Sequence, residues 1–261
     1  SRIDGEGNAA GVKSSTGGFL MGVDAPVADA WRLGLMAGYS RSDFDANDRA
    51  SSGHSDNYHL GAYGGGQWGA LGLRGGLAYS WHDIATRRSV AMPGFADRLK
   101  AGYDGRTAQA FIDLGYRIEA AAVALEPVAN LAYVNLRTDG YRESGGAAAL
   151  HASGQTTETT FTTLGLRAAS GFELGRAQAM ARSSLGWRHA LGDIKPVATQ
   201  AFSAGDAFTV AGVAIARDSA VIEAGLDLQV TPRTVLGLPY QGQLAGAARD
   251  HGVRANLAIR F

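Results

Sequence analysis

Cysteine is absent from this chain of 261 residues, and proline and net charge are both scarce. Without a thiol, the chain has neither a disulfide framework nor a thiolate metal site. Its 24 basic and 24 acidic residues give a formal net charge of zero, and no basic cluster indicates a nucleic-acid partner. Only 6 prolines accompany 37 glycines, without a collagen repeat, a combination that suits many closely packed strands better than a disordered chain.

No stretch of the sequence reaches the roughly 18 consecutive apolar residues that a membrane-spanning helix needs. The most apolar segment, Ala120 to Leu136, is interrupted by Glu126 and Asn130. Strands of a membrane barrel alternate between apolar and polar residues, so each gives only a weak local signal. The opening Ser1-Arg-Ile-Asp4 lacks the apolar core of a secretory signal, and we therefore expect a C-terminal piece of a longer precursor.

The last strand of the sequence shows the alternation most clearly. Its apolar face is formed by Val253, Ala255, Leu257, Ile259 and Phe261, and its polar face by Arg254, Asn256 and Arg260. A period of two is typical of an extended strand with one apolar and one polar face. An aromatic residue at the end of such a strand fits the membrane interface of an outer-membrane barrel.

The same period recurs upstream, giving eleven full strands and a first strand that is cut short at the N-terminus. Tight turns such as Gly69-Ala70 alternate with long polar connections. Long loops are expected at about residues 45–55, 84–105, 138–154 and 191–217, the last folding partly into a hairpin. Because membrane barrels combine short periplasmic turns with long outer loops, the sequence predicts an all-β, 12-stranded antiparallel transmembrane β-barrel. It would be an up-and-down meander forming one domain over residues 1–261.

Charged residues recur on the polar faces of the predicted strands. Charges that line a closed barrel hydrate the lumen and pair with one another or with its occupant. The residues predicted to line the lumen and contact that occupant are Arg74, Asp113, Arg117, Glu126, Arg167, Arg182, Arg188, Glu223, Asp227 and Arg254. The alternative for each of them is that it only keeps the barrel rigid.

Aromatic residues gather at or near the ends of the apolar stripes, where interfacial girdles lie. The predicted girdle consists of Trp31, Tyr39, Tyr58, Trp68, Tyr79, Trp81, Tyr116, Tyr133 and Trp187. A soluble all-β sandwich or propeller would instead place such aromatics in a dry core. Burial of Leu226 and Leu228 in such a core would contradict the membrane barrel.

Several motifs together resemble the C-terminal translocator domain of classical, type V autotransporters. They are Gly17–Asp24, Trp31–Ser40, Asp56–Tyr63, Leu125–Tyr133, Glu223–Asp227 and the terminal Phe261. The resemblance covers nearly the whole chain and implies a twelve-stranded outer-membrane barrel of Gram-negative bacteria. Such a barrel carries its own N-terminal passenger to the cell surface. The pore-threading linker helix of the family and the passenger are not recognisable here, so the activity of the passenger is left open.

The resemblance also implies partners. The lumen would hold first the extended passenger and then the linker helix, while lipid surrounds the barrel. The outer-membrane insertion machinery would read the final strand through Val253, Leu257, Ile259 and Phe261, and periplasmic chaperones would accompany the chain. We expect the barrel to be a monomer.

The sequence predicts neither catalysis nor a cofactor nor a metal site, because its six histidines lack metal-ligand spacing. Ser80 and His82 share one predicted inward face, which keeps a barrel hydrolase as a minor alternative. A passive outer-membrane pore, recognised by a loop folded into the lumen, is the other alternative. A proline inside a closed sheet forfeits a ladder hydrogen bond, so a local bulge is predicted near the periplasmic or central part of the strand that contains Pro239, and Pro127 raises the same question.

Overall fold

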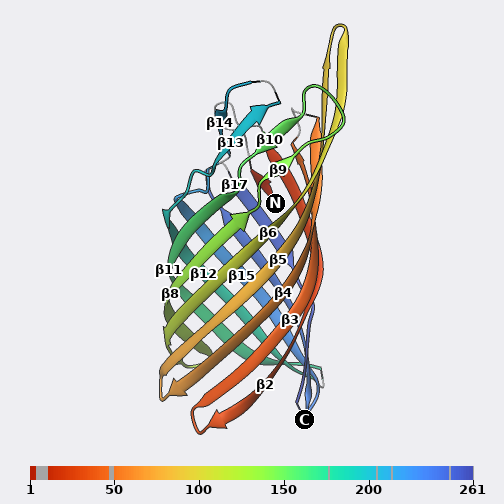
Figure 1. Ribbon diagram of the computed structural model, residues 1–261. Helices are drawn as coiled ribbons and strands as arrows, with labels where there is room; N and C mark the ends of the chain where they lie inside the picture. Colours follow the sequence, from red (N-terminus) through yellow and green to blue (C-terminus); the bar gives the residue numbers. More distant parts are fainter. Residues whose placement is uncertain are drawn as a thin grey trace.

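The computed structural model describes residues 1–3, 11–46, 50–175, 177–203, 205–212, 214–246 and 248–260. They form a closed antiparallel barrel of twelve wall strands, as the sequence predicts. Figure 1 shows the strands tilted across the cylinder, with short turns at the end where the C-terminus lies and long connections at the other end. Among the described residues, no helix is long and apolar enough to cross a membrane.

The wall strands follow one another in chain order, which is the predicted up-and-down meander. They are β1 (Arg2–Ile3), β2 (Val12–Ala28), β3 (Trp31–Ala46), β4 (Ser51–Trp68), β5 (Leu71–Met92), β6 (Phe95–Tyr116) continued by β7 (Ile118–Ala120), β8 (Val123–Thr138), β11 (Gln155–Leu174), β12 (Ala177–Gly192), β15 (Asp218–Thr231), β16 (Thr234–Leu244), and β17 (Ala248–Val253) continued by β18 (Asn256–Ile259). Each pairs with its neighbours in antiparallel register.

The connection predicted as a loop at about residues 84–105 is instead a continuous hairpin. Strand β5 runs on to Met92, β6 begins at Phe95, and Gly94 turns the chain between them with a φ of 81°. In Figure 1 this hairpin rises above every other part of the molecule. Cross-strand pairing continues through this segment up to Met92 and Phe95, so both strands stay extended beyond the apolar part of the barrel.

A second, four-stranded sheet lies at the end with the long connections (Figure 1). Its strands, in spatial order, are β14 (Phe208–Ala211), β13 (Val197–Phe202), β10 (Leu150–Ala152) and β9 (Tyr141–Arg142). We call this sheet the cap. Its β13–β14 pair confirms the hairpin predicted within residues 191–217. Buried apolar residues collect in the cap and on the inner face of β6, among them Leu99, Leu150 and Ala201.

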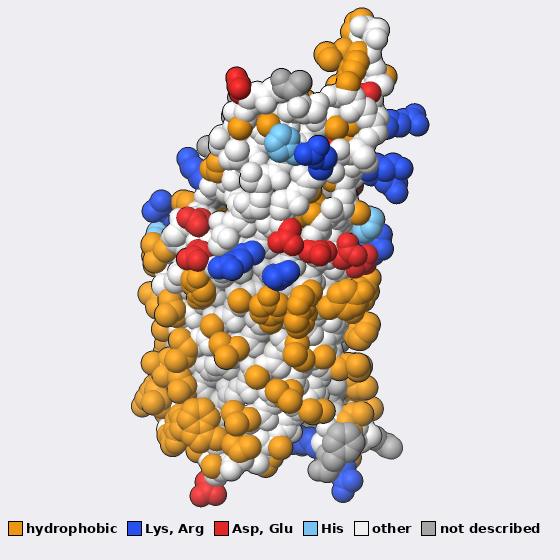
Figure 2. All heavy atoms as spheres, viewed as in Figure 1, with side chains coloured by type: hydrophobic (Ala, Val, Ile, Leu, Met, Phe, Trp, Pro, Cys, Tyr) orange, Lys and Arg blue, Asp and Glu red, His pale blue; other side chains and the backbone are white. Residues whose placement is uncertain are grey.

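The outer face of the barrel is apolar, and the wall encloses no dry core. Large side chains such as Leu35, Leu77 and Leu185 are more than three-fifths exposed, and Figure 2 shows a continuous hydrophobic belt around the visible face. Leu226 is exposed as well, which contradicts the soluble alternative. Among the described residues, Leu99 is the only large side chain that is almost completely buried.

The ladder between β15 and β16 is irregular at its short-turn end, where the register shifts between Gln229 and Thr231 of β15. At Pro239 itself there is no bulge, because Pro239 pairs with Gly225 in unbroken register. The ladder instead stops on the other side, where β17 ends at Val253 and β18 resumes at Asn256. A missing N–H therefore opens a gap in one ladder without shifting the register. Pro127 behaves in the same way, because it pairs with β11 and faces the break between β6 and β7.

The barrel closes through a short seam. The predicted truncated first strand is confirmed as β1, which joins β17 through Arg2 and Ile3 and joins β2 through the same two residues. Below β1, the described parts of β2 and of β17–β18 have no strand between them. We call this stretch the seam.

Candidate functional site in the barrel lumen

Four charged residues meet on consecutive strands of the inner wall. Register places Arg74 (β5) beside Asp113 (β6), and Glu126 (β8) beside Arg167 (β11). Arg167 donates from both terminal nitrogens to Asp113, with Nη1–Oδ1 and Nη2–Oδ2 distances of 2.9 and 2.7 Å. Its Nη1 also lies 3.2 Å from Glu126 Oε1. Arg74 completes the group, with Nη1 3.5 Å from Asp113 Oδ1 and Nη2 3.2 Å from Glu126 Oε1.

This group of Arg74, Asp113, Glu126 and Arg167, the lumenal cluster, is electrically neutral within itself. The carboxylate of Asp113 is buried and the two guanidinium groups are one-third to one-half exposed. The bidentate contact of Arg167 fixes the geometry of the cluster, because two parallel charge-assisted hydrogen bonds restrict both side chains. The exposed sides of the arginines remain available to a lumenal occupant.

The adjoining strands β12 and β15 carry a second pair. Arg182 Nη2 on β12 lies 2.7 Å from Asp227 Oδ2 on β15, and the Arg182 side chain is 62% exposed. Nearby, Ser184 Oγ donates to Glu223 Oε2 at 3.4 Å. A cavity of about 660 Å³ adjoins both groups and is lined by residues that include Arg74, Glu126, Arg167, Arg182, Glu223 and Asp227. These six predicted lumenal residues therefore come from distant parts of the sequence to one space.

Three of the predicted lumenal residues lie apart from the lumenal cluster. Arg117 lines the same cavity and pairs with Glu119. Arg188 Nη1 donates to Gln243 Oε1 at 3.0 Å, and its guanidinium carbon lies 5.8 Å from the centre of the Phe161 ring. Arg254 donates to a glutamine side chain of β16. These three arginines have polar partners, but they do not join the lumenal cluster.

The contact between Ser80 and His82 that the sequence left possible is not formed. Ser80 is buried and its Oγ lies 2.8 Å from Nδ1 of His59, while Nε2 of His59 lies 2.9 Å from Ser40 Oγ. His82 Nδ1 instead contacts Asn57 Oδ1 at 2.6 Å. Cross-strand register explains the exchange, because Ser80 is the direct partner of His59. No carboxylate among the described residues orients the His59 ring, so the arrangement lacks the third group of a hydrolytic triad.

This network of serine, histidine and asparagine side chains was not foreseen from the sequence. Its members stand on β3, β4 and β5, separated by about 20 residues along the chain. The strand register could have predicted the network. Ser40, His59 and Ser80 all face inward, and they become neighbours once β3, β4 and β5 are aligned. The network stabilises the inner wall of these strands through hydrogen bonds.

The cap is fastened to the inner face of the extended β5–β6 hairpin. The rings of Tyr103 and Tyr141 stack at a centroid distance of 4.7 Å and an angle of 18°. Burial raises the pKa of Tyr103 to about 12. Arg88 Nε donates to Glu143 Oε1 at 3.1 Å, and the same carboxylate accepts from the backbone of Leu150. Tyr103 precedes Asp113 by ten residues on β6, so this contact lies at the mouth and not beside the lumenal cluster.

The aromatic residues of the predicted girdle lie on the outer face, and two groups of them stand at opposite ends of the wall. At the long-loop end, register aligns Tyr39, Tyr58 and Trp81 side by side on β3, β4 and β5. At the short-turn end, the rings of Trp31 and Trp68 form an edge-to-face pair with centroids 5.1 Å apart. The other predicted members, Tyr79, Tyr116, Tyr133 and Trp187, are also exposed. Tyr39 is partly covered.

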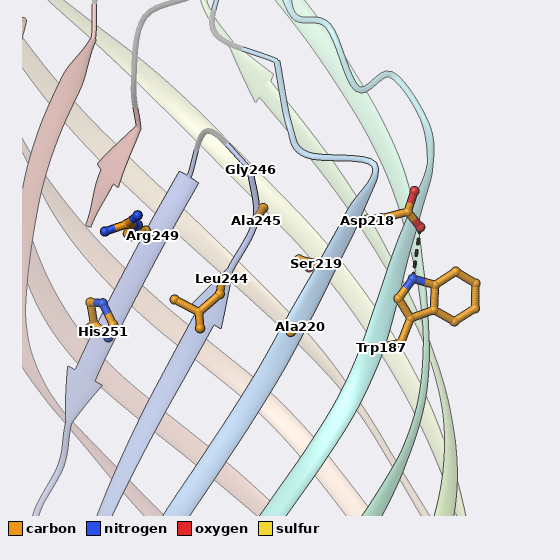
Figure 3. A pocket seen from close by; sticks show the side chains of 9 residues that line it. All are labelled: Trp187, Asp218, Ser219, Ala220, Leu244, Ala245, Gly246, Arg249 and His251. Atoms are coloured by element: carbon orange, nitrogen blue, oxygen red, sulfur yellow. Dashed lines mark hydrogen bonds between the residues drawn. The ribbon is translucent and has the colours of Figure 1, made fainter.

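A groove on the outer surface adjoins Trp187. Figure 3 shows Trp187 Nε1 donating to Asp218, with Leu244, Arg249 and His251 lying across β16 and β17. The Trp187 Nε1–Asp218 Oδ1 distance is 3.0 Å. The groove has a volume of about 730 Å³. Its Trp187–Asp218 contact joins an aromatic ring to a polar partner, as expected at an interface between lipid and water.

The residues of the predicted assembly signal lie on the last wall strand. Val253, Leu257 and Ile259 are all more than half exposed on the outer side of the seam. Phe261, the fourth residue of that prediction, lies outside the described residues. The exposure is compatible with recognition by another protein, but it also suits simple contact with lipid.

A closed wall with an apolar outer belt and a charged lumen defines a β-barrel of the outer membrane. The family model of the autotransporter beta-domain matches residues 1–241. The chain therefore belongs to the autotransporter β-domain family, whose barrels lie in the outer membrane of Gram-negative bacteria.

Two curated relatives, each named extracellular serine protease and both from Serratia marcescens, are 43% and 42% identical to the chain over 258 residues. The matches cover 98% of this chain and 25% of each relative, so the chain spans about a quarter of their length.

Solved structures share the fold. The translocator domain of the autotransporter NalP from Neisseria meningitidis superposes with a TM-score of 0.80 at 17% identity, covering 100% of this chain and 84% of that one. The beta domain of the Bordetella autotransporter BrkA gives 0.68 at 20% identity, covering 100% and 95%. The transport unit of AIDA-I from Escherichia coli gives 0.62 at 16% identity, covering 96% and 84%.

Proposed function

We propose that the lumenal cluster and the Arg182–Asp227 pair line the path of an exported polypeptide. The chain is an outer-membrane translocator barrel that exports a passenger domain, and such a barrel is not itself catalytic. The observation that supports the proposal is the cavity that both charged groups line, with mixed charges and half-exposed guanidinium groups. Mixed charges hydrate an extended chain without binding one sign of charge strongly. The same side chains would later contact the linker helix.

The absence of cysteine allows a direct test by site-specific crosslinking. In the full-length protein, one cysteine replaces Arg182 and a second cysteine is placed in the passenger. The passenger is then stalled during export. A disulfide between them is expected when the passenger occupies the lumen. Leu77→Cys on the lipid-facing wall is the matched control and should not crosslink. Equal crosslinking at Leu77, or none at Arg182 while the passenger still appears outside, would reject the proposed path.

We infer that the passenger of this barrel is an extracellular serine protease. This proposal rests on the names of the two Serratia relatives, whose identity to the chain extends along the whole barrel. The test is secretion of an activity that a serine-directed inhibitor blocks and that disappears when the barrel is deleted. Persistence of the secreted activity without the barrel would contradict the assignment.

We also propose that residues 1–261 act as one domain and as a monomer, delivered by periplasmic chaperones to the insertion machinery. The exposed residues Val253, Leu257 and Ile259 support a role of the final strand in this step, together with Phe261. Leu257→Asp is expected to reduce insertion while Asp250→Asn, on the same strand pair, leaves it intact. Normal amounts of inserted Leu257→Asp barrel would exclude the proposed signal.

A further inference from the structure

One row of the outer face contains two arginines in the position of aromatic residues. Register aligns Tyr58 with Trp81, Trp81 with Arg106, and Arg106 with Arg137, on the neighbouring strands β4, β5, β6 and β8. Tyr58 and Trp81 are exposed on the lipid-facing side, and both arginines are exposed in the same row. The row therefore continues the aromatic girdle with two adjacent positive charges.

The height of this row follows from strand geometry. Below Arg106, the outer face of β6 carries only apolar and aromatic residues down to Tyr116, including Ile112 and Leu114. At a rise of about 3.4 Å per residue and a tilt of about 40°, the segment from Arg106 to Tyr116 spans about 26 Å. The apolar band of an outer-membrane barrel is about 25 Å tall. Arg106 therefore lies at the outer boundary of the membrane when Tyr116 lies at the inner boundary.

Neither guanidinium group has an ion-pair partner among the described residues, and the nearest carboxylate on the next strand, Glu158, lies diagonally from Arg137 and accepts a hydrogen bond from Asn135. Across the described ranges, no hydrogen bond or ion pair is formed by the guanidinium group of Arg106 or Arg137, and their α-carbons are direct cross-strand partners. Like charges placed directly opposite one another destabilise a sheet. An anion bound between the two groups would remove this repulsion and accept hydrogen bonds from both.

The residues above the row decide from which side an anion arrives. Asp83 and Asp104 are also direct cross-strand partners, one step further toward the long loops, and both are exposed. Figure 2 shows such acidic and basic side chains immediately above the hydrophobic belt. The two carboxylates repel a free anion that approaches from the outer solution. An anion that belongs to a lipid reaches Arg106 and Arg137 from the membrane side, while its acyl chains contact the apolar belt.

We propose that Arg106 and Arg137 form a clamp for the phosphate groups of a phosphorylated glycolipid in the outer leaflet. Guanidinium groups bind phosphate oxygens with paired hydrogen bonds, and the apolar surface below them fits acyl chains. The clamp is independent of passenger export, because it lies on the outer face of the wall and the export path lies inside.

The test uses the folded protein in zwitterionic detergent micelles, with bisphosphorylated lipid A as the probe. Bound lipid is counted by native mass spectrometry, and the heat-induced shift in gel mobility confirms that each variant is folded. We expect the double variant Arg106→Gln and Arg137→Gln to bind the probe at least fivefold more weakly than the unaltered protein. The double variant Arg106→Lys and Arg137→Lys is expected to recover part of the binding, because it keeps charge but loses the paired geometry.

The matched control is Arg233→Gln, which removes an exposed arginine at the short-turn end and is expected to leave binding unchanged. Lipid A stripped of its phosphates should bind equally weakly to the unaltered protein and to the double glutamine variant. Equal binding of the intact probe to both of these proteins would overturn the clamp. Displacement of the lipid by millimolar inorganic phosphate would also overturn it, since the site would then take the free anion.

Discussion

Replacing Asp113 with asparagine tests whether the lumenal cluster stabilises the barrel. The substitution keeps the size of the side chain but removes the charge that Arg167 contacts at 2.7 and 2.9 Å. Removing one partner of a buried ion pair costs about 3–5 kcal/mol. Here Arg74 and Arg167 are partly solvated, and Glu126 stays within 3.2 Å of both, so we expect a smaller loss of about 2 kcal/mol.

The assay is the temperature at which the barrel loses its folded mobility on a detergent gel. A loss of about 2 kcal/mol corresponds to a decrease of about 4–8 °C for a chain of this size. Asp83→Asn removes an exposed carboxylate without a described ion pair and is the matched control, with no expected decrease.

A double-mutant cycle identifies the contact responsible. If Asp113 and Arg167 stabilise the barrel through each other, Arg167→Gln added to Asp113→Asn costs less than Arg167→Gln alone, with a coupling of about 1 kcal/mol or more. Additive decreases, or a decrease for Asp113→Asn no larger than for Asp83→Asn, would refute the reasoning. The cluster would then be a surface-like group of charges that happens to face inward.

Three further outcomes are expected from single positions. Because burial raises the pKa of Tyr103 to about 12, ionisation of Tyr103 leaves the cap intact below about pH 10 and costs up to about 2 kcal/mol by pH 12. Tyr103→Phe is expected to reduce the alkaline loss in a proteolysis assay of the cap, and the stacked Tyr141, whose pKa burial also raises, contributes the remainder. Leu77→Lys on the lipid face is expected to lower the free energy of reversible folding into lipid by about 2–4 kcal/mol. Leu244→Lys, near the membrane boundary, is expected to lower it by only about 0–1 kcal/mol, and equal losses for the two variants would contradict this order. Gly69→Ala, at a φ of 58°, is expected to lower stability by about 1 kcal/mol in the same assay, whereas Gly72→Ala, with ordinary φ and open space, is expected to cost clearly less.

The strands of the wall were predictable because each has a consistent period of two. Leu77 and Tyr79 alternate with inward residues on β5, and a slip of one residue would move the whole apolar set into the lumen. The same alternation identified Arg74, Asp113, Glu126 and Arg167 as inward residues, although it contains no information on the distances between them. Which of these charges meet depends on the register of four strands, and that register is set by turns and by the barrel as a whole.

The upper part of the molecule was harder to predict, because alternation loses its meaning outside the membrane. Between Ile84 and Gly105 both faces of the strands contact water or the cap, and both can therefore carry polar residues such as Arg87 and Lys100. Without alternation, the segment was predicted as a loop although it is an extended hairpin. The cap itself depends on contacts between segments far apart in sequence, such as Tyr103 with Tyr141. The gaps in the hydrogen-bond ladders beside Pro239 and Pro127 were missed for another reason. A strand can lose one N–H donor without inserting a residue.

Closure of the cylinder joins the two ends of the chain. Most neighbouring wall strands follow one another in the sequence, whereas closure pairs Arg2 with Arg249 and Ile3 with Ala248. Because the entropic cost of closing a loop rises with its length, this contact is the most costly of the wall to form. In hydrogen-exchange labelling during refolding, we expect amides of the β5–β6 hairpin to gain protection before those of β17.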